Sequence, residues 1–146
     1  MTPAVYTIQP AANALRRIRN SEMNASGRIK KAAFMPRKEK DRDGLSVSIE
    51  RSELRESHRA KFESEGHRAC QVAVRAVREL SPLDVIPSPT QEDPAHALIT
   101  GIPDRTRGPE ELAAAEHFAE ELAKRASRYD FPDCAEPGRD EGTRTT

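Results

Sequence analysis

A chain of 146 residues with a formal net charge of zero fits a single domain. Hydrophobic residues make up 36% and charged residues 33%, which predicts one modest core, roughly between residues 28 and 129, with disordered ends. No run approaches the ~18 apolar residues that a membrane-spanning helix needs, and the N-terminus lacks the basic-then-apolar order of a signal peptide. These features argue against a membrane protein and predict a cytoplasmic one.

The charges are divided unevenly along the chain. Residues 1–60 carry 13 Lys or Arg and 7 Asp or Glu, a net of +6, whereas residues 61–146 carry 11 and 17, a net of −6. Such a division either lets the two halves attract each other within one fold or turns a positive face toward an anionic partner.

The first residues give weak structural signals. Residues 1–10 contain two prolines and no periodic pattern, so a flexible arm is expected there. Residues 11–19 fit either a short helix or a first strand. Leu15 and Ile18 are three apart, as on a helical face, but two positions do not decide between these alternatives.

A basic segment, residues 28–42, follows a polar turn and contains seven Lys or Arg residues against two acidic ones. A short apolar run inside it predicts a strand over 29–35. The sequence Arg-Asp-Gly at 42–44 is typical of a turn, so residues 36–43 are expected to form a solvated hairpin loop.

The clearest strand signal is Leu-Ser-Val-Ser-Ile at residues 45–49, where apolar and small polar side chains alternate. A period of two indicates a half-buried strand. The three apolar side chains are expected to face the core, and Ser46 and Ser48 are expected to face outward.

A weakly docked helix is expected next. Ser52 is a suitable cap for a helix that runs to about residue 65, and Gly66 is a suitable stop. Its apolar line is thin and consists of Leu54, His58 and Phe62.

Residues 69–80 are ambiguous, because their polar residues share one side of a helical wheel while their valines favour a strand. We divide them into a strand over 69–74 and a helical turn over 75–80. Two further short strands, 83–86 and 95–102, flank a loop rich in proline.

The most distinct helix is predicted over 109–128. Gly108 and Pro109 suit its start, and apolar residues recur at spacings of three and four to give one narrow stripe. From residue 130 onward, proline, glycine and charge predict a disordered tail. The expected architecture is therefore one α+β domain over 11–129, a small, mostly antiparallel sheet covered by the C-terminal amphipathic helix.

Five short segments between residues 13 and 101 form a recognisable pattern. They are Leu15-Arg16-Arg17-Ile18, Ala33-Phe34, Gly44-Leu45-Ser46-Val47, Val85-Ile86-Pro87 and Asp93-Pro94-Ala95-His96-Ala97-Leu98-Ile99. The pattern resembles that of a group of short bacterial proteins with no established activity. The resemblance implies this order of elements and a bacterial cytoplasmic setting, and Arg17, Ser46 and His96 occur together in it.

Three residues are candidates for chemistry. His96, which follows a proline turn, could act as a general acid or base, or simply satisfy a backbone carbonyl. Ser46 lacks the second glycine of a nucleophile elbow, so it fits an outward strand residue as well as a site residue. Arg17, with Arg16 beside it, could hold a phosphate bidentately, or both could lie on a solvated face.

The basic segment is the main candidate for partner binding. Its cations could follow a nucleic-acid backbone while Phe34 stacks on a base, although Phe34 also suits the core. The cations assigned to binding are Arg28, Lys30, Lys31, Arg37, Lys38 and Lys40.

The sequence implies no metal site and no cofactor. Cys70 and Cys134 are too few and too far apart for a disulfide framework or a metal cluster. His58 has no second ligand on its helix face and His117 stands alone on an acidic helix. The seven glycines are scattered singly, so a phosphate loop is not expected.

Three hypotheses follow for the function. The leading one is a binding module whose basic segment contacts an acidic protein or nucleic acid. The second is a small enzyme that acts on a nucleotide or another phosphate-bearing substrate, with His96 as acid or base, Arg17 on the phosphate and Ser46 orienting the substrate. The third is a dimerisation or scaffold element that uses helix 109–128.

Overall fold

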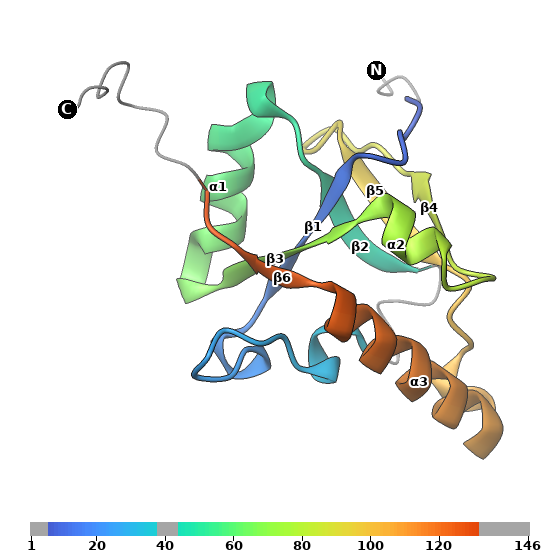
Figure 1. The fold of residues 1–146 in the computed structure, drawn as a ribbon. Helices are drawn as coiled ribbons and strands as arrows, with labels where there is room; N and C mark the ends of the chain where they lie inside the picture. Colours follow the sequence, from blue (N-terminus) through green and yellow to red (C-terminus); the bar gives the residue numbers. More distant parts are fainter. Residues whose placement is uncertain (1–5, 38–43, 132–146) are drawn as a thin grey trace.

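The computed structural model describes residues 6–37 and 44–131, which form a six-stranded sheet with α-helices on both faces (Figure 1). The strand order is β4-β5-β2-β1-β3-β6, and every neighbouring pair is antiparallel. The predicted α+β class is confirmed. The strands are β1 (Asn13–Ile18), β2 (Leu45–Ile49), β3 (Arg68–Ala73), β4 (Asp84–Pro87), β5 (His96–Thr100) and β6 (Ser127–Tyr129).

Most of the sequence-based strand assignments are confirmed. Residues 13–18, left open between helix and strand, form β1 at the centre of the sheet. The ambiguous segment divides as expected into β3 and the short helix α2 (Val74–Arg78), so the valine preference for extended structure prevails before residue 74.

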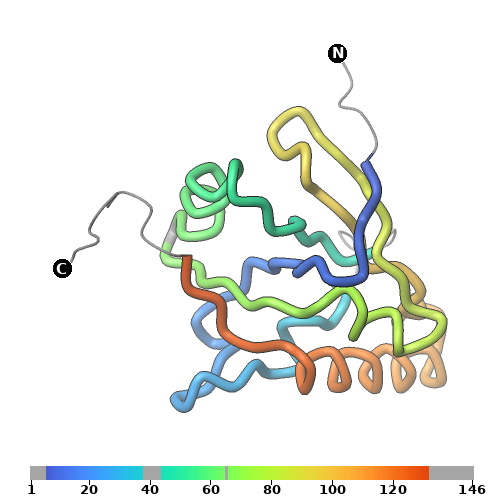
Figure 2. The backbone as a smooth tube through the Cα atoms, turned by 45° about the horizontal axis from the view of Figure 1, so that its top comes forward, coloured from blue at the N-terminus to red at the C-terminus, as the bar shows by residue number. Residues whose placement is uncertain are grey.

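The main core lies between one face of the sheet and the helix α3 (Pro109–Arg125), which runs beneath it in Figure 2. The apolar stripe of α3 packs inward, since Ala115, Ala119 and Leu122 are fully buried. Its small alanines allow a close approach, and Phe34 and Val77 fill the remaining space from other segments. Apart from Arg16, this face of the sheet is closed and apolar.

A second, smaller core lies on the opposite face, under the helix α1 (Arg55–Glu63). It consists of Leu15, Phe62, Ala69 and Phe131. The rings of Phe62 and Phe131 meet edge to face, with their centroids 5.8 Å apart. Because α1 spans only part of this face, the polar side chains of β2 and β5 lie beside the helix rather than under a full apolar layer.

The prediction of a strand over 29–35 is wrong. Residues Lys31–Phe34 form a 3-10 helix, and only Ile29 makes an isolated bridge, to Met23. The reason is tertiary: Ala33 and Phe34 are buried in the main core, and the Ala33 carbonyl accepts a hydrogen bond from a side chain of β1 rather than from a strand. Most of the expected loop over 36–43 lies outside the described residues.

The two predicted helices are shorter than expected. Residues 52–66 divide into a 3-10 turn, α1 and a second 3-10 turn, and α1 has no side-chain cap at its start. Helix α3 ends at Arg125 rather than at residue 128. The chain is extended at Ala126, and residues 127–129 pair with β3 as strand β6, where hydrogen bonds to a sheet edge replace a further helical turn.

Both ends of the described chain pack on the domain. Ile8 and Phe131 are buried, and the Tyr6 hydroxyl donates a hydrogen bond to the His96 carbonyl. Residues 1–5 of the expected arm and residues 132–146 of the expected tail lie outside the described residues, whereas Ile8 and Phe131, which belong to these two segments, are buried. In the part of the chain that the structure describes, no helix combines the length and the apolar character that a bilayer span requires.

Candidate functional site

The central strands β1 and β2 separate at one end of the sheet. They pair at Ala14 with Ile49 and at Leu15 with Ser48, and the ladder between them goes no further. By contrast, β1 pairs with β3 along its whole length. The second half of β1 and the first half of β2 therefore diverge, and backbone groups that would pair in a continuous sheet need other partners.

Arg16 bridges this separation. Its Nη1 donates to the Ser46 carbonyl at 2.8 Å and its Nε donates to the Ala33 carbonyl at 2.5 Å. The side chain is 8% exposed and its guanidinium lies 5.9 Å from the centroid of the Phe34 ring. Arg16 thus joins β1, β2 and the 3-10 helix, and it brings a positive charge to the base of the opening.

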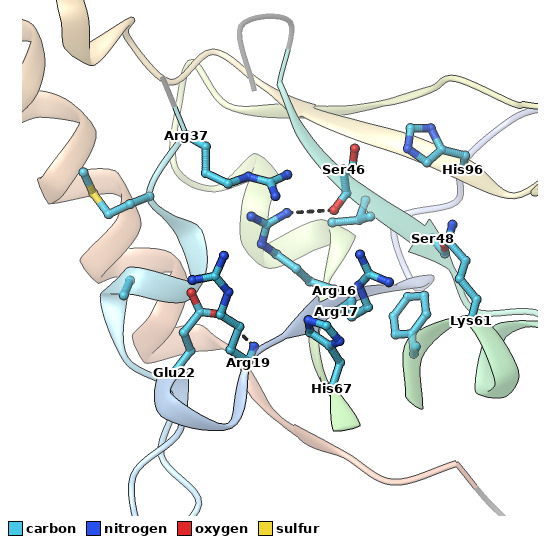
Figure 3. A pocket seen from close by; sticks show the side chains of 14 residues that line it. Arg16, Arg17, Arg19, Glu22, Arg37, Ser46, Ser48, Lys61, His67 and His96 are labelled. Atoms are coloured by element: carbon cyan, nitrogen blue, oxygen red, sulfur yellow. Dashed lines mark hydrogen bonds between the residues drawn. The ribbon is translucent and has the colours of Figure 1, made fainter. Parts of the chain in front are cut away.

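A pocket of about 500 Å³ lies over this separation (Figure 3). Five cationic side chains contribute to its walls, and the acidic residue among its lining is Glu22. Glu22 already accepts a hydrogen bond at 2.8 Å from the Arg19 backbone N–H. The net charge of the lining is positive, as in sites that hold anions. The cations are Arg16, Arg17, Arg19, Arg37 and Lys61.

The structure brings together the three residues that the sequence suggested for chemistry. Arg17, Ser46 and His96 all line this pocket, from strands β1, β2 and β5. A joint hold of Arg16 and Arg17 on one phosphate was one of two alternatives from the sequence, and it is disfavoured because neighbouring residues of a strand point to opposite faces. Arg16 is buried toward the main core, whereas Arg17 is exposed.

The buried carboxylate of Asp93 holds two residues of the pocket wall in place. Asp93 Oδ2 accepts hydrogen bonds from the Ser48 hydroxyl at 2.5 Å and from Lys61 Nζ at 3.3 Å. Asp93 Oδ1 contacts His58 Nε2 at 3.0 Å and accepts from the Ala95 backbone N–H at 3.0 Å. Ser48 was expected to face outward; it does lie on that face, but it is 1% exposed.

This cluster holds elements together and is not arranged as a hydrolytic triad. In such a triad the histidine lies between the serine and the carboxylate, whereas here Asp93 lies between Ser48 and His58. Burial alone would raise the pKa of the Asp93 carboxyl. The hydrogen bonds from His58 and Ser48 and the charges of His58 and Lys61 outweigh burial and hold that pKa well below its ordinary value. Asp93 is therefore a fixed anion.

Two histidines line the pocket, and both rings are anchored in the same manner. His96 Nδ1 lies 2.8 Å from the Ser88 carbonyl oxygen, and His67 Nδ1 lies 2.9 Å from the Ser64 carbonyl oxygen. A carbonyl oxygen only accepts, so Nδ1 carries the proton in each ring and Nε2 is the remaining nitrogen. The sequence suggested His96 but not His67.

The basic segment contributes to the pocket only in part. Arg37 is in the pocket wall, together with Ala32 and Met35 from the same segment. Arg28, Lys30 and Lys31 are exposed on the residues that lead into this wall. Lys38 and Lys40 lie outside the described residues, and Phe34 is fully buried in the main core, so it is not a stacking platform.

Several residues of the site escaped the sequence analysis. Lys61, on α1, had no signal beyond one charge in a charged helix, and its role depends on how that helix crosses the sheet. Asp93 stands three residues before His96, within the Asp-Pro-Ala-His segment, and that closeness was the available signal. Ser48 had no sequence signal beyond its place in the alternation of residues 45–49, because its position opposite His96 on β5 is known only from the strand register.

The described residues contain no cluster of three or more His, Cys, Asp or Glu side chains able to hold a metal ion. Cys70 is a buried free thiol on β3, and burial raises its pKa to about 12. A thiol with such a pKa stays protonated and unreactive at neutral pH. Cys134 lies outside the described residues.

Comparisons with protein-family models, with curated proteins and with solved structures gave no significant match. The resemblance to short bacterial proteins therefore stays an expectation, and the function is argued from the site alone.

Proposed function

We propose that this protein binds single-stranded nucleic acid, with the pocket between β1 and β2 holding the phosphate backbone. The observation that carries the proposal is the gathering of five cationic side chains around about 500 Å³ of open volume. These cations come from β1, the residue Arg19 just after it, α1 and the basic segment, so the fold collects charges that are far apart in the sequence.

The chemistry of the lining suits phosphate oxygens. Guanidinium groups present paired N–H donors that match a phosphate, and the ammonium of Lys61 adds a compact charge. Arg16 and Lys61 are each held by hydrogen bonds to the protein, at 2.8 Å and 3.3 Å. Two cations are thus fixed before a ligand arrives, which lowers the entropy that binding costs.

A chain of phosphates fits better than a single one. The exposed cations Arg28, Lys30 and Lys31 continue the positive charge beyond the pocket wall that holds Arg37. A mononucleotide in the pocket would leave these charges unused, whereas a strand of several nucleotides would engage them. The low aromatic content of 4% favours backbone binding over base stacking, so little sequence preference is expected.

The test is the affinity of the full chain for a fluorescent 12-nucleotide strand, measured by anisotropy over a range of salt concentrations. The double variant Arg17→Ala, Arg19→Ala removes two pocket cations. The control Arg75→Ala, Arg107→Ala removes two exposed cations outside the pocket and changes the net charge equally. The pocket variant should bind more weakly and lower the salt slope by about 0.7 per side chain lost, and the control should not.

Two results would overturn the proposal: wild type that does not bind at low salt, or pocket and control variants that lose equal affinity. The rival partner, an acidic protein, is tested by competition with polyglutamate. If polyglutamate displaces the strand at an equal concentration of charge, the site binds carboxylates as well as it binds phosphates, and the assignment to nucleic acid fails.

The scaffold hypothesis receives less support from the packing. It relied on the apolar stripe of α3, but Ala115, Ala119 and Leu122 in this stripe are fully buried within the protein, and Ala119 and Leu122 belong to the main core. A partner helix would have to displace the main core to reach them.

A further inference from the structure

His96 is positioned by hydrogen bonds to its ring and to its backbone. Its Nδ1 donates to the Ser88 carbonyl, its backbone N–H donates to the Asp93 carbonyl at 3.1 Å, and its own carbonyl accepts from Tyr6 at 2.6 Å. Burial raises the pKa of Tyr6 to about 12, so that hydroxyl keeps its proton. In the neutral ring, the unprotonated Nε2 is therefore the basic atom of a residue that lines the pocket.

A fixed cation stands beside this base. His96 on β5 and Ser48 on β2 are directly opposed in the sheet, which places their Cβ atoms about 5 Å apart on one face. Ser48 and Lys61 share the same oxygen of Asp93. The ammonium of Lys61 and the imidazole of His96 therefore border the same corner of the pocket, as Figure 3 shows.

The pocket supplies a base and cations; Ser46 keeps its assigned role of orienting the ligand, and the nucleophile is assigned to the ligand itself. The Ser48 hydroxyl is 1% exposed and directs its proton to Asp93. Asp93, as a fixed anion, is a weak base. In RNA the 2′-hydroxyl adjoins each phosphodiester, so a bound RNA strand carries a nucleophile in the place where a neighbouring base can act on it.

We infer that this pocket cleaves RNA by transesterification, with His96 as the general base. The inference rests on the proposed binding of a phosphate backbone. His96 Nε2 takes the proton of the 2′-hydroxyl, the 2′-oxygen bonds to phosphorus, and the bond from phosphorus to the 5′-oxygen breaks. The leaving oxygen takes a proton from solvent water, and the imidazolium returns its proton to solvent.

Besides a general base, the reaction requires groups that stabilise the negative charge of the reacting phosphate. The five-coordinate phosphorus carries more negative charge on its oxygens than the ground state, and nearby fixed cations stabilise that charge. Lys61 and Arg17 line the pocket on the side of His96 and are assigned to this role. The products are a strand that ends in a 2′,3′-cyclic phosphate and a strand that begins with a 5′-hydroxyl, and no water is consumed.

The decisive variant is His96→Asn. The amide of asparagine can still donate to the Ser88 carbonyl, but nothing replaces Nε2. Cleavage of a 12-nucleotide RNA by this variant should be about 100-fold slower or more, because general-base catalysis contributes that much. Binding of the RNA should change by less than about twofold, since the charge of the pocket is kept. His117→Asn, at an exposed histidine of α3, is the matched control.

Wild-type protein gives tests that need no variant. A 2′-deoxy strand of the same sequence should bind and stay intact, and mass spectrometry of the RNA products should find cyclic phosphate ends. The inference is overturned if wild type binds RNA without cutting it, if the deoxy strand is cut equally, or if His96→Asn cuts as fast as wild type. Absence of RNA binding would instead overturn the proposed function.

Discussion

The two faces of the sheet differ in how they are closed. The face under α3 is closed and mostly apolar, with Phe34, Val77 and Leu122 fully buried on it and Arg16 as its buried charge. The face under α1 has a core of four residues beside a buried carboxylate and an open cationic pocket. One face maintains the fold and the other carries polar groups at a cost in stability, which is the usual division between a scaffold and a site.

The largest difference in stability between the two faces is expected when one phenylalanine on each face is replaced by alanine. Phe34→Ala leaves a closed cavity in the main core and should lower the free energy of unfolding by about 4 kcal/mol. Phe62→Ala should cost less, about 2–3 kcal/mol, because Phe62 borders the pocket and water can enter the space it leaves. Urea denaturation followed by circular dichroism measures both. Equal losses would show that the second face is as tightly closed as the first.

A smaller effect is expected from Asp93, which joins α1 to the sheet. Its pKa is lowered in the folded state, so around pH 4 the unfolded chain binds more protons than the native one. The stabilisation by Asp93 is therefore complete above the ordinary carboxyl pKa and is lost as the pH falls below it, toward the depressed native value.

Asp93→Asn should remove about 3 kcal/mol at neutral pH, since His58 and Lys61 lose their counter-charge. It should also flatten the dependence of stability on pH below about 4. Thermal unfolding of wild type and variant between about pH 7 and about pH 2.5 measures both effects. If the two curves run parallel in acid, Asp93 is not the group responsible.

The smallest effect distinguishes two serines on the same face and the same strand. Ser48→Ala removes a buried donor to a carboxylate and should cost about 1–2 kcal/mol. Ser46→Ala removes an exposed hydroxyl whose backbone carbonyl, not its side chain, is held by Arg16, and should change stability by less than about 0.5 kcal/mol. Each serves as the control for the other in a denaturation experiment. A reversed order would contradict the assigned burial.

The sequence predicted local structure well where one period dominated. The alternation at residues 45–49 and the stripe of α3 required no knowledge of neighbours. The prediction failed where tertiary contacts determine the structure. Ala33 and Phe34 were predicted in a strand, but packing in the core and the hydrogen bond from Arg16 to the Ala33 carbonyl favour a 3-10 helix. Strand β6 was not predicted, because three residues are too few to show a hydrophobic periodicity.

The site was predicted in parts and not as a unit. Arg17, Ser46 and His96 were each suggested from local context, and the structure places them around one pocket. Lys61 and His67 could not be selected, because only the crossing of α1 and the path of the loop before β3 bring them there. Pairwise register, which a single sequence does not reveal, is what turns separate polar residues into a site.

The outermost strands of the sheet have a consequence for association between molecules. Strand β4 has four residues and ends in Pro87, which lacks an N–H, and β6 has three residues. A further strand laid against either border would find few hydrogen-bonding groups to pair with. Such edge strands disfavour the edge-to-edge pairing of sheets that leads to fibrils. The protein should therefore resist polymerisation at high concentration.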